Sequence, residues 1–325
     1  MATQPPSLDS AQHQIGLGLA ALGRPGYITS DRERDLPAGR GVDAMRRRTH
    51  KVLDHAYERG VRYFDAARSY GRAEEFLAEW LNDGSERPGV VVGSKWGYTY
   101  TADWQIEAEQ QEVKDHSSAT YSRQLAESRI LLGSRLNLYQ VHSVTTDSPA
   151  LTDVSLHKRL AALAAEGVTV GITTSGPDQA DTIRAALDVS VGGAPLFRSV
   201  QATWNLLEPS AGPALAEAHG SGCMVIVKEA LANGRLVRPD ARLDPLLGPV
   251  AEATETSYDA VALAAALQQP WSDVVLAGAV TTGQLDSNLR APAITLGPDQ
   301  LSPLVTDLAE PPAAYWTHRS RLPWN

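Results

Sequence analysis

The segment VRYFDAARSYG, Val61–Gly71, joins two sequence patterns whose junction indicates the fold. Its first half is rich in β-branched and aromatic residues, which is typical of a buried β-strand. Asp65 stands where that strand would end, and Tyr70 follows five residues later in a polar stretch closed by glycine. The segment therefore predicts a core strand whose end carries an acid and a phenol.

Seven further apolar runs of similar length lie along the chain, and longer amphipathic stretches separate them. Several runs are nearly continuous Val, Ile and Leu, which is typical of parallel strands buried on both faces. The predicted strands are residues 14–20, 61–66, 89–96, 136–143, 168–174, 199–204, 224–229 and 273–278. The predicted helices are residues 44–60, 72–84, 120–133, 155–167, 178–188, 212–222 and 258–269.

This alternation, with a final helical segment, predicts a (β/α)₈ TIM barrel, and a doubly wound open sheet is the alternative. No linker or composition shift divides the chain, so we expect one domain over residues 1–325, with residues 1–12 flexible. Three predicted strand-to-helix loops are long, and in a barrel they would emerge at the C-terminal face as lids. These loops are residues 21–43, 97–119 and 233–257.

The composition excludes several classes of function. A net charge of −9 argues against a nucleic-acid partner and against binding to anionic membrane surfaces. Cys223 is the single cysteine, so no intrachain disulfide and no CxxC zinc pair can form. With a polar N-terminal stretch and no apolar run of membrane-spanning length, we expect a cytoplasmic protein that does not enter a membrane. The oligomeric state stays open.

Four polar residues stand at or just after the ends of the second, third and fourth predicted strands: Asp65, Tyr70, Lys95 and His142. Adjacent barrel strands bring such ends together. A phenol with a pKa of about 10 is a poor proton donor near neutrality, and a nearby ammonium group such as Lys95 lowers that pKa. Asp65 would hold Lys95 in place, and His142 would polarise a substrate oxygen. The group suits protonation of an alkoxide, which carbonyl reduction requires together with a hydride source.

Other catalytic designs fit poorly. The stretch GLGLAALG, residues 16–23, lacks the G-x-G-x-x-G spacing of a dinucleotide loop. The chain has no Walker loop and no G-x-S-x-G elbow, and its histidines show no metal-ligand spacing. We therefore expect no metal site.

Six motifs, in order, resemble those of the aldo-keto reductase family, from about Ile15 to Leu289. They are FDAARSYG (64–71), GSKWG (93–97), YQVHS (139–143), VGITTSGP (170–177), QATWNLLE (201–208) and LAGAVTTGQLDSNL (276–289). The resemblance implies that Tyr70 is the general acid/base, that Lys95 and Asp65 tune it, and that His142 orients the carbonyl. It also implies a nicotinamide cofactor, normally NADP(H), bound across the barrel mouth.

The same resemblance assigns cofactor contacts on the fifth and sixth strands. Gln201 occupies the position that binds the nicotinamide carboxamide, and Trp204 would replace a tyrosine that stacks on the ring. Thr173 and Thr174 stand where the family commonly has Ser-Asn, so the second position lacks the paired donor and acceptor of an amide.

Further contacts are implied near the last two strands. In the final motif, the cofactor-binding segment begins at Gly278, and Gln284 and Asn288 match adenine-contacting positions. This motif has no basic residue for a 2′-phosphate, so NAD(H) remains an alternative cofactor. Lys228 would supply positive charge near the phosphates.

The implied function is a nicotinamide-dependent oxidoreductase that reduces an aldehyde or ketone to an alcohol, or catalyses the reverse. The alternative is a nucleotide-binding accessory or redox-sensing barrel with slow or vestigial activity. The presence of all four catalytic positions favours the enzyme. Tyr27 and Trp96 would form walls for a small carbonyl or alcohol substrate, and the tail 311–325 would lie near the mouth. In that tail, we expect Arg319 to be solvated surface charge.

Overall fold

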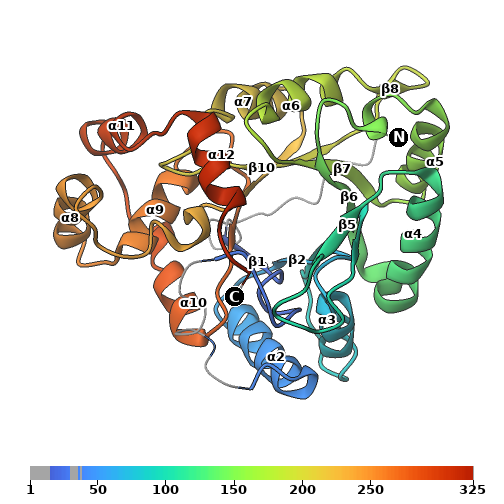
Figure 1. Cartoon of the computed structure of the whole chain (residues 1–325), viewed down its shortest axis with the longest axis horizontal. Helices are drawn as coiled ribbons and strands as arrows, with labels where there is room; N and C mark the ends of the chain where they lie inside the picture. Colours follow the sequence, from blue (N-terminus) through green and yellow to red (C-terminus); the bar gives the residue numbers. More distant parts are fainter. Residues whose placement is uncertain (1–14, 30–35, 37–38, 325) are drawn as a thin grey trace.

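Eight parallel strands close into a barrel surrounded by helices in the computed structural model, which describes residues 15–29, 36 and 39–324 (Figure 1). Around the barrel the strands follow the order β1-β12-β11-β10-β7-β6-β3-β2. The closed ring confirms the (β/α)₈ barrel and excludes the open sheet. The segment 1–12, which we expected to be flexible, lies outside the described residues.

Each barrel strand overlaps one of the eight apolar runs of the sequence. The strands are β1 (Ile15–Gly18), β2 (Tyr63–Asp65), β3 (Val91–Trp96), β6 (Leu136–Val144), β7 (Thr169–Thr174), β10 (Ser199–Thr203), β11 (Met224–Lys228) and β12 (Val274–Ala277). The outer helices are α2 (Val42–Glu58), α3 (Ala73–Leu81), α4 (Ser118–Leu132), α5 (Val154–Ala165), α6 (Gln179–Leu187), α7 (Gly212–Gly220), α9 (Tyr258–Leu267) and α10 (Thr282–Asn288).

Tyr63 fills the barrel interior below the site. A Cβ atom at Gly93 on β3 would lie 2.3 Å from the Tyr63 hydroxyl oxygen, and one at Gly16 on β1 would lie 2.9 Å from its Cδ1. Glycine at both positions therefore makes room for the ring. Asp65 is two residues further along β2, so its side chain points into the same interior. The phenol of Tyr63 donates to Asp65 Oδ1 at 3.5 Å.

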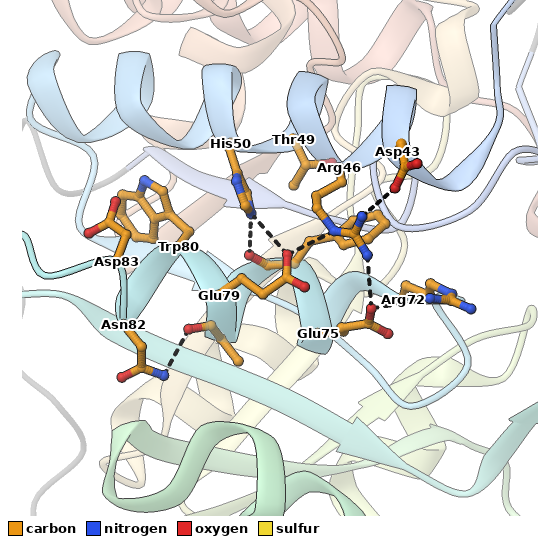
Figure 2. Close-up of polar contacts among 12 residues, drawn as sticks. Asp43, Arg46, Thr49, His50, Arg72, Glu75, Glu79, Trp80, Asn82 and Asp83 are labelled. Atoms are coloured by element: carbon orange, nitrogen blue, oxygen red, sulfur yellow. Dashed lines mark hydrogen bonds and ion pairs between the residues drawn. The ribbon is translucent and has the colours of Figure 1, made fainter.

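Helices α2 and α3 pack side by side outside β1 and β2, and a network of ion pairs joins the two helices (Figure 2). Arg46 on α2 contacts Glu75 at 3.3 Å and Glu79 at 2.9 Å on α3. His50 Nε2 lies 2.9 Å from the carbonyl oxygen of Phe76. Exposed pairs of this kind add little stability, whereas the buried apolar faces hold α2 and α3 against the barrel. The Ala73 N–H at the start of α3 donates to the Tyr70 carbonyl oxygen at 3.0 Å, so α3 anchors the loop that carries Tyr70.

Regular structure also occurs inside two of the long loops. Residues 97–119 contain the hairpin of β4 (Tyr98–Tyr100) and β5 (Glu112–Lys114), and residues 233–257 contain α8 (Asp244–Ala253). Pro249 and Gly248 lie within α8, and both weaken a helical signal in the sequence.

The remaining elements are short or lie near the end of the chain. They are β8 (Ser190–Val191), β9 (Ala194–Pro195), α11 (Pro298–Asp307), α12 (Pro312–Ser320) and the 3₁₀ turns η2 (Gly133–Arg135), η3 (Pro149–Leu151), η4 (Ala232–Gly234) and η5 (Ala291–Ala293). No helix in the described part of the chain is both long and apolar enough to span a membrane.

Candidate active site

A cavity of about 280 Å³ opens at the carboxyl ends of the barrel strands. Its wall includes residues at the ends of β1, β2, β6, β11 and β12, together with the long loops and the C-terminal segment. Nine of the residues predicted for the site line it: Tyr27, Asp65, Tyr70, His142, Gln201, Lys228, Gly278, Gln284 and Asn288.

Lys95 and Asp65 form a buried ion pair at one side of the cavity floor. Lys95 is fully buried and donates hydrogen bonds to Asp65 Oδ2 and, at 2.9 Å, to the carbonyl oxygen of Ala66. Gln201 donates from Nε2 to Asp65 Oδ1 at 3.0 Å. Burial lowers the pKa of Lys95, and the negative charge of Asp65 opposes that shift. The pair holds both side chains in fixed positions.

Tyr70 reaches the cavity from the loop between β2 and α3. Lys95 Nζ lies 4.7 Å from the centre of its ring, and the imidazole of His142 meets that ring edge-on with centroids 5.5 Å apart. Burial and the charge of Asp65 raise the pKa of Tyr70 well above 10, although Arg24 opposes the shift. We expected Lys95 to lower the pKa of Tyr70, and this lowering is not found. The ammonium group of Lys95 is already paired with Asp65, so the effect of burial on the Tyr70 pKa is larger.

A bulge in β6 directs His142 toward the cavity. The register with β7 shifts between Val141 and Val144, and Ser143 adopts a φ of 53°. The Ser143 N–H donates to Thr173 Oγ1 at 2.7 Å, and His116 Nε2 lies 2.8 Å from the His142 carbonyl oxygen. Burial and the charge of Lys95 lower the pKa of His142 well below 6.5, so the imidazole is neutral near pH 7.

His116 is a site-supporting residue that the sequence did not indicate. Its Nδ1 lies 2.6 Å from Ser148 Oγ, so both ring nitrogens have partners that fix the ring. Burial lowers the pKa of His116 to about 4. A histidine inside a long loop gives no sequence signal for contact with a strand.

A second buried charge cluster closes the cavity beyond β11. Glu229, directly after Lys228, adopts a φ of 55° and accepts hydrogen bonds from Arg319 Nε at 3.0 Å. Burial raises the pKa of Glu229, but the charges of Arg319 and Lys228 outweigh it and bring that pKa to about 2. Arg319 belongs to α12, so the expectation that it is solvated surface charge is wrong.

Lys228 lies between this cluster and the catalytic residues. Its Nζ donates to Thr203 Oγ1 at 2.8 Å and lies 3.9 Å from Glu229 Oε1. Burial lowers the pKa of Lys228 to about 8, a shift that Glu229 opposes. The ammonium group is thus present at neutral pH on the wall of the cavity.

The C-terminal segment and the loop after β1 together cover the catalytic side. Trp324 pairs with Ile28 in an isolated antiparallel bridge, and the guanidinium carbon of Arg24 lies 4.6 Å from the centre of the Trp324 indole. Arg24 also pairs with Glu112 on β5 at 3.0 Å. Three segments that are distant in sequence therefore meet above Tyr70.

Asn288 and Asp259 form the wall on the opposite side. Asn288 Nδ2 donates to Asp259 Oδ2 at 2.7 Å, which links α10 to α9, and both side chains are buried. Gln284 accepts from the Val280 N–H through Oε1 at 2.9 Å. Asp259 was not predicted as a site residue, because an acid in the first turn of a helix is an ordinary N-terminal residue.

Five predicted residues do not line the cavity: Lys95, which is buried behind Tyr70, and Trp96, Thr173, Thr174 and Trp204. Trp204 is 2% exposed and packs against Trp271, with ring centroids 5.8 Å apart. Trp96 is fully buried against Tyr121. Thr173 supports the bulge at Ser143, and the hydroxyl of its neighbour Thr174 is buried and has no hydrogen-bond partner among the described residues. Among those residues, no cluster of three His, Cys, Asp or Glu side chains could hold a metal.

Comparison with known proteins identifies related sequences and folds. A sequence model of the aldo/keto reductase family matches residues 14–305. An aldo-keto reductase from Bacillus halodurans, solved in its holo form, is 21% identical, with a TM-score of 0.67 over 92% of each chain. One from Klebsiella pneumoniae, solved in complex with NADPH, is 19% identical, with a TM-score of 0.65 over 92% of this chain and 91% of that one.

Aldo-keto reductase str7 of Strobilurus tenacellus is 31% identical over 86 residues. This match covers 26% of the present chain and 21% of the relative. The aligned part is thus about a fifth of that protein, whereas the two solved structures share the fold over nearly their whole length.

Proposed function

Because the chain belongs to the aldo/keto reductase family, a family of NAD(P)H-dependent oxidoreductases, we propose that it reduces an aldehyde or ketone to an alcohol, or catalyses the reverse. One observation carries the proposal: Tyr70 and His142 face one cavity, with the Lys95–Asp65 pair buried against the Tyr70 ring. This arrangement combines a proton donor with a neutral hydrogen-bond donor.

In the direction of reduction, Tyr70 is the general acid. Its raised pKa keeps the phenol protonated at neutral pH, ready to donate to an oxygen that gains negative charge. His142 is neutral and donates a hydrogen bond to the same oxygen, which polarises the carbonyl. The Lys95–Asp65 pair is buried behind the ring, with Lys95 Nζ 4.7 Å from the ring centre, and holds the phenol in position.

The residues of the cavity wall fit a nicotinamide dinucleotide. Gln201 offers an amide beside the catalytic residues, Lys228 offers an ammonium group along the wall, and Asn288 offers an amide on the far side. At Gly278 no atom lies within 4 Å of where a Cβ would stand, so the wall there is open to a ligand. The bound nicotinamide would supply the hydride.

Substrate would enter beside Tyr27 and Trp324, which line the cavity on the catalytic side. Their rings provide apolar faces, and the Arg24–Glu112 pair adds polar groups next to Tyr70. A small carbonyl or alcohol with both apolar and hydroxyl surface fits this wall.

The test is steady-state turnover of NADH or NADPH with a panel of aldehydes and ketones. Tyr70→Phe should lower turnover by at least about a hundredfold and leave the cofactor Kd nearly unchanged. Tyr57→Phe is the matched control, since this half-buried phenol donates to the Pro88 carbonyl oxygen and does not line the cavity. Full turnover by Tyr70→Phe would remove Tyr70 from its role. Cofactor binding without turnover of any carbonyl would favour an accessory or redox-sensing protein.

A further inference from the structure

The side of the cavity formed by α9 and α10 lies across the barrel from His142. In the ring of strands, three strands separate β12 from β6 in either direction, so the two are diametrically opposed. Asp259 precedes β12 on α9, and Asn288 follows it on α10; both line the cavity. An extended dinucleotide with its nicotinamide beside Tyr70 and His142 would place its adenosine on this side.

Two side-chain oxygens on this side, in Asn288 and Asp259, can accept a hydrogen bond from a ligand, whereas the Gln284 amide group can donate one. The amide nitrogen of Asn288 donates a hydrogen bond to Asp259 Oδ2. The side-chain carbonyl oxygen of Asn288 accepts no hydrogen bond from the described residues. Asp259 Oδ1 likewise accepts no hydrogen bond within the described part of the chain. Buried acceptors favour a ligand group that donates, such as a ribose hydroxyl or an exocyclic amino group.

Positive charge lies elsewhere on the wall. Residues 258–288, which form α9, β12 and α10, contain no Lys or Arg. Arg24 pairs with Glu112, and Arg319 pairs with Glu229. Lys228 lies at the end of β11 beside Thr203, and Arg238 lines the cavity from the loop before α8.

We propose that Asp259 is a specificity-determining residue that accepts a hydrogen bond from the adenosine of the cofactor and disfavours a 2′-phosphate, so that the protein binds NAD(H) more tightly than NADP(H). The inference rests on the proposed function, because it assumes a nicotinamide dinucleotide in this cavity. A phosphate next to a buried carboxylate is repelled strongly where water is excluded. Acidic residues contact the ribose 2′-hydroxyl in other dinucleotide sites for the same reason.

The experiment measures the Kd of NADH and of NADPH separately, by fluorescence titration of the whole protein. Wild-type protein should bind NADH at least about tenfold more tightly, a difference of about 1.4 kcal/mol. Asp259→Asn keeps the shape and an acceptor for Asn288 but removes the charge, and it should reduce the ratio of the two Kd values by about tenfold. Asp286→Asn is the control, because Asp286 pairs with His55 and Arg59 and does not line the cavity.

Three results would overturn the inference. Wild-type protein that binds NADPH as tightly as NADH would contradict it, and so would an unchanged ratio in Asp259→Asn. A shift of the ratio toward NADH in Arg238→Ala would make Arg238 a ligand of the 2′-phosphate. All three leave the proposed function intact, whereas a wild-type protein that binds neither nucleotide contradicts both.

Titration with the hypoxanthine analogue of NADH, which lacks the adenine amino group, identifies the group that donates to Asp259. If wild-type protein binds the analogue more weakly than NADH and Asp259→Asn removes this difference, the donor is the adenine amino group. If wild-type protein binds the two equally, the donor is the ribose.

Discussion

The ammonium group of Lys95 is hydrogen-bonded to the carboxylate of Asp65, and neither side chain has appreciable contact with solvent. Each charge is stable in the interior because the other is present. Asp65 also accepts from Gln201, so the pair links three barrel strands beneath the proposed reaction site. Loss of one partner should therefore affect the whole site.

Lys95→Met should lower the free energy of unfolding by about 3–5 kcal/mol, because it leaves the buried carboxylate of Asp65 without a countercharge. Urea denaturation measures this loss. The double variant with Asp65→Asn should recover much of it, since no unpaired charge then remains. Lys158→Met, at an exposed position, should change stability by less than about 0.5 kcal/mol. A loss equally small in Lys95→Met would contradict the importance of the pair.

The maximal rate of reduction should stay level between about pH 6 and pH 9 when cofactor and substrate saturate the enzyme. The raised pKa of Tyr70 keeps the phenol protonated, and therefore active as an acid, across this range. Alcohol oxidation needs the deprotonated form, so its rate should rise with pH over the same interval. A reduction rate that falls with an apparent pKa near 8 would show that another group is the acid.

Cofactor affinity should weaken as the pH rises through about 8, where Lys228 loses its proton. The ammonium form below this pH provides positive charge for the cofactor phosphates, and loss of such a contact weakens binding about tenfold to a hundredfold. Titrations of Kd at several pH values measure the effect. Lys228→Met should bind weakly and show a flat profile. A wild-type profile as flat as that of the variant would place the phosphates elsewhere.

Arg319→Met should destabilise the protein by about 3–5 kcal/mol and release α12 from the barrel, because Glu229 is buried and would lose its main partner. Hydrogen exchange should become faster in residues 312–324, and urea denaturation should report the loss. Arg321→Met is a suitable control, since Arg321 is exposed on the same segment. Equal exchange rates in the two variants would mean that the ion pair does not hold α12.

Stability should fall as the pH decreases from about 6.5 toward 4, in part through His116. The folded state holds His116 neutral down to a pKa of about 4, whereas the unfolded chain takes up the proton near 6.5. Protonation therefore favours the unfolded state within this window, by roughly 2 kcal/mol at pH 5. The free energy of unfolding, measured by urea denaturation at several pH values, should fall less with acid in His116→Gln than in wild type. In His318→Gln, at an exposed position, it should fall as in wild type. The same dependence on pH in all three proteins would exclude this contribution of His116.

The sequence predicts all eight barrel strands, because a parallel barrel strand is buried on both faces and its apolar residues run nearly without interruption. It also predicts the meeting of Asp65, Tyr70, Lys95 and His142. A closed ring of parallel strands brings their carboxyl ends to one face, so the position of a residue along its strand is enough to place it there.

Contacts that depend on side-chain direction could not be predicted in this way. Glu229 and Arg319 are 90 residues apart, and no local pattern indicates that the last helix returns to the barrel. Trp204 follows the last residue of β10, but its indole lies against Trp271 and not at the cavity. The bulge at Ser143 likewise depends on a hydroxyl from the neighbouring strand, which the spacing of apolar residues does not show.

The bridge between Ile28 and Trp324 has a practical consequence. Any polypeptide joined after Trp324 begins at the cavity wall, so an affinity tag or a surface linker attached there would crowd the entrance. The exposed turn at Gly192–Gly193 joins β8 to β9 in a helix-to-strand connection, and such connections lie at the opposite end of a barrel. A dye or solid support attached at that turn would leave the entrance clear, which makes the turn the better place for immobilising the protein in binding measurements.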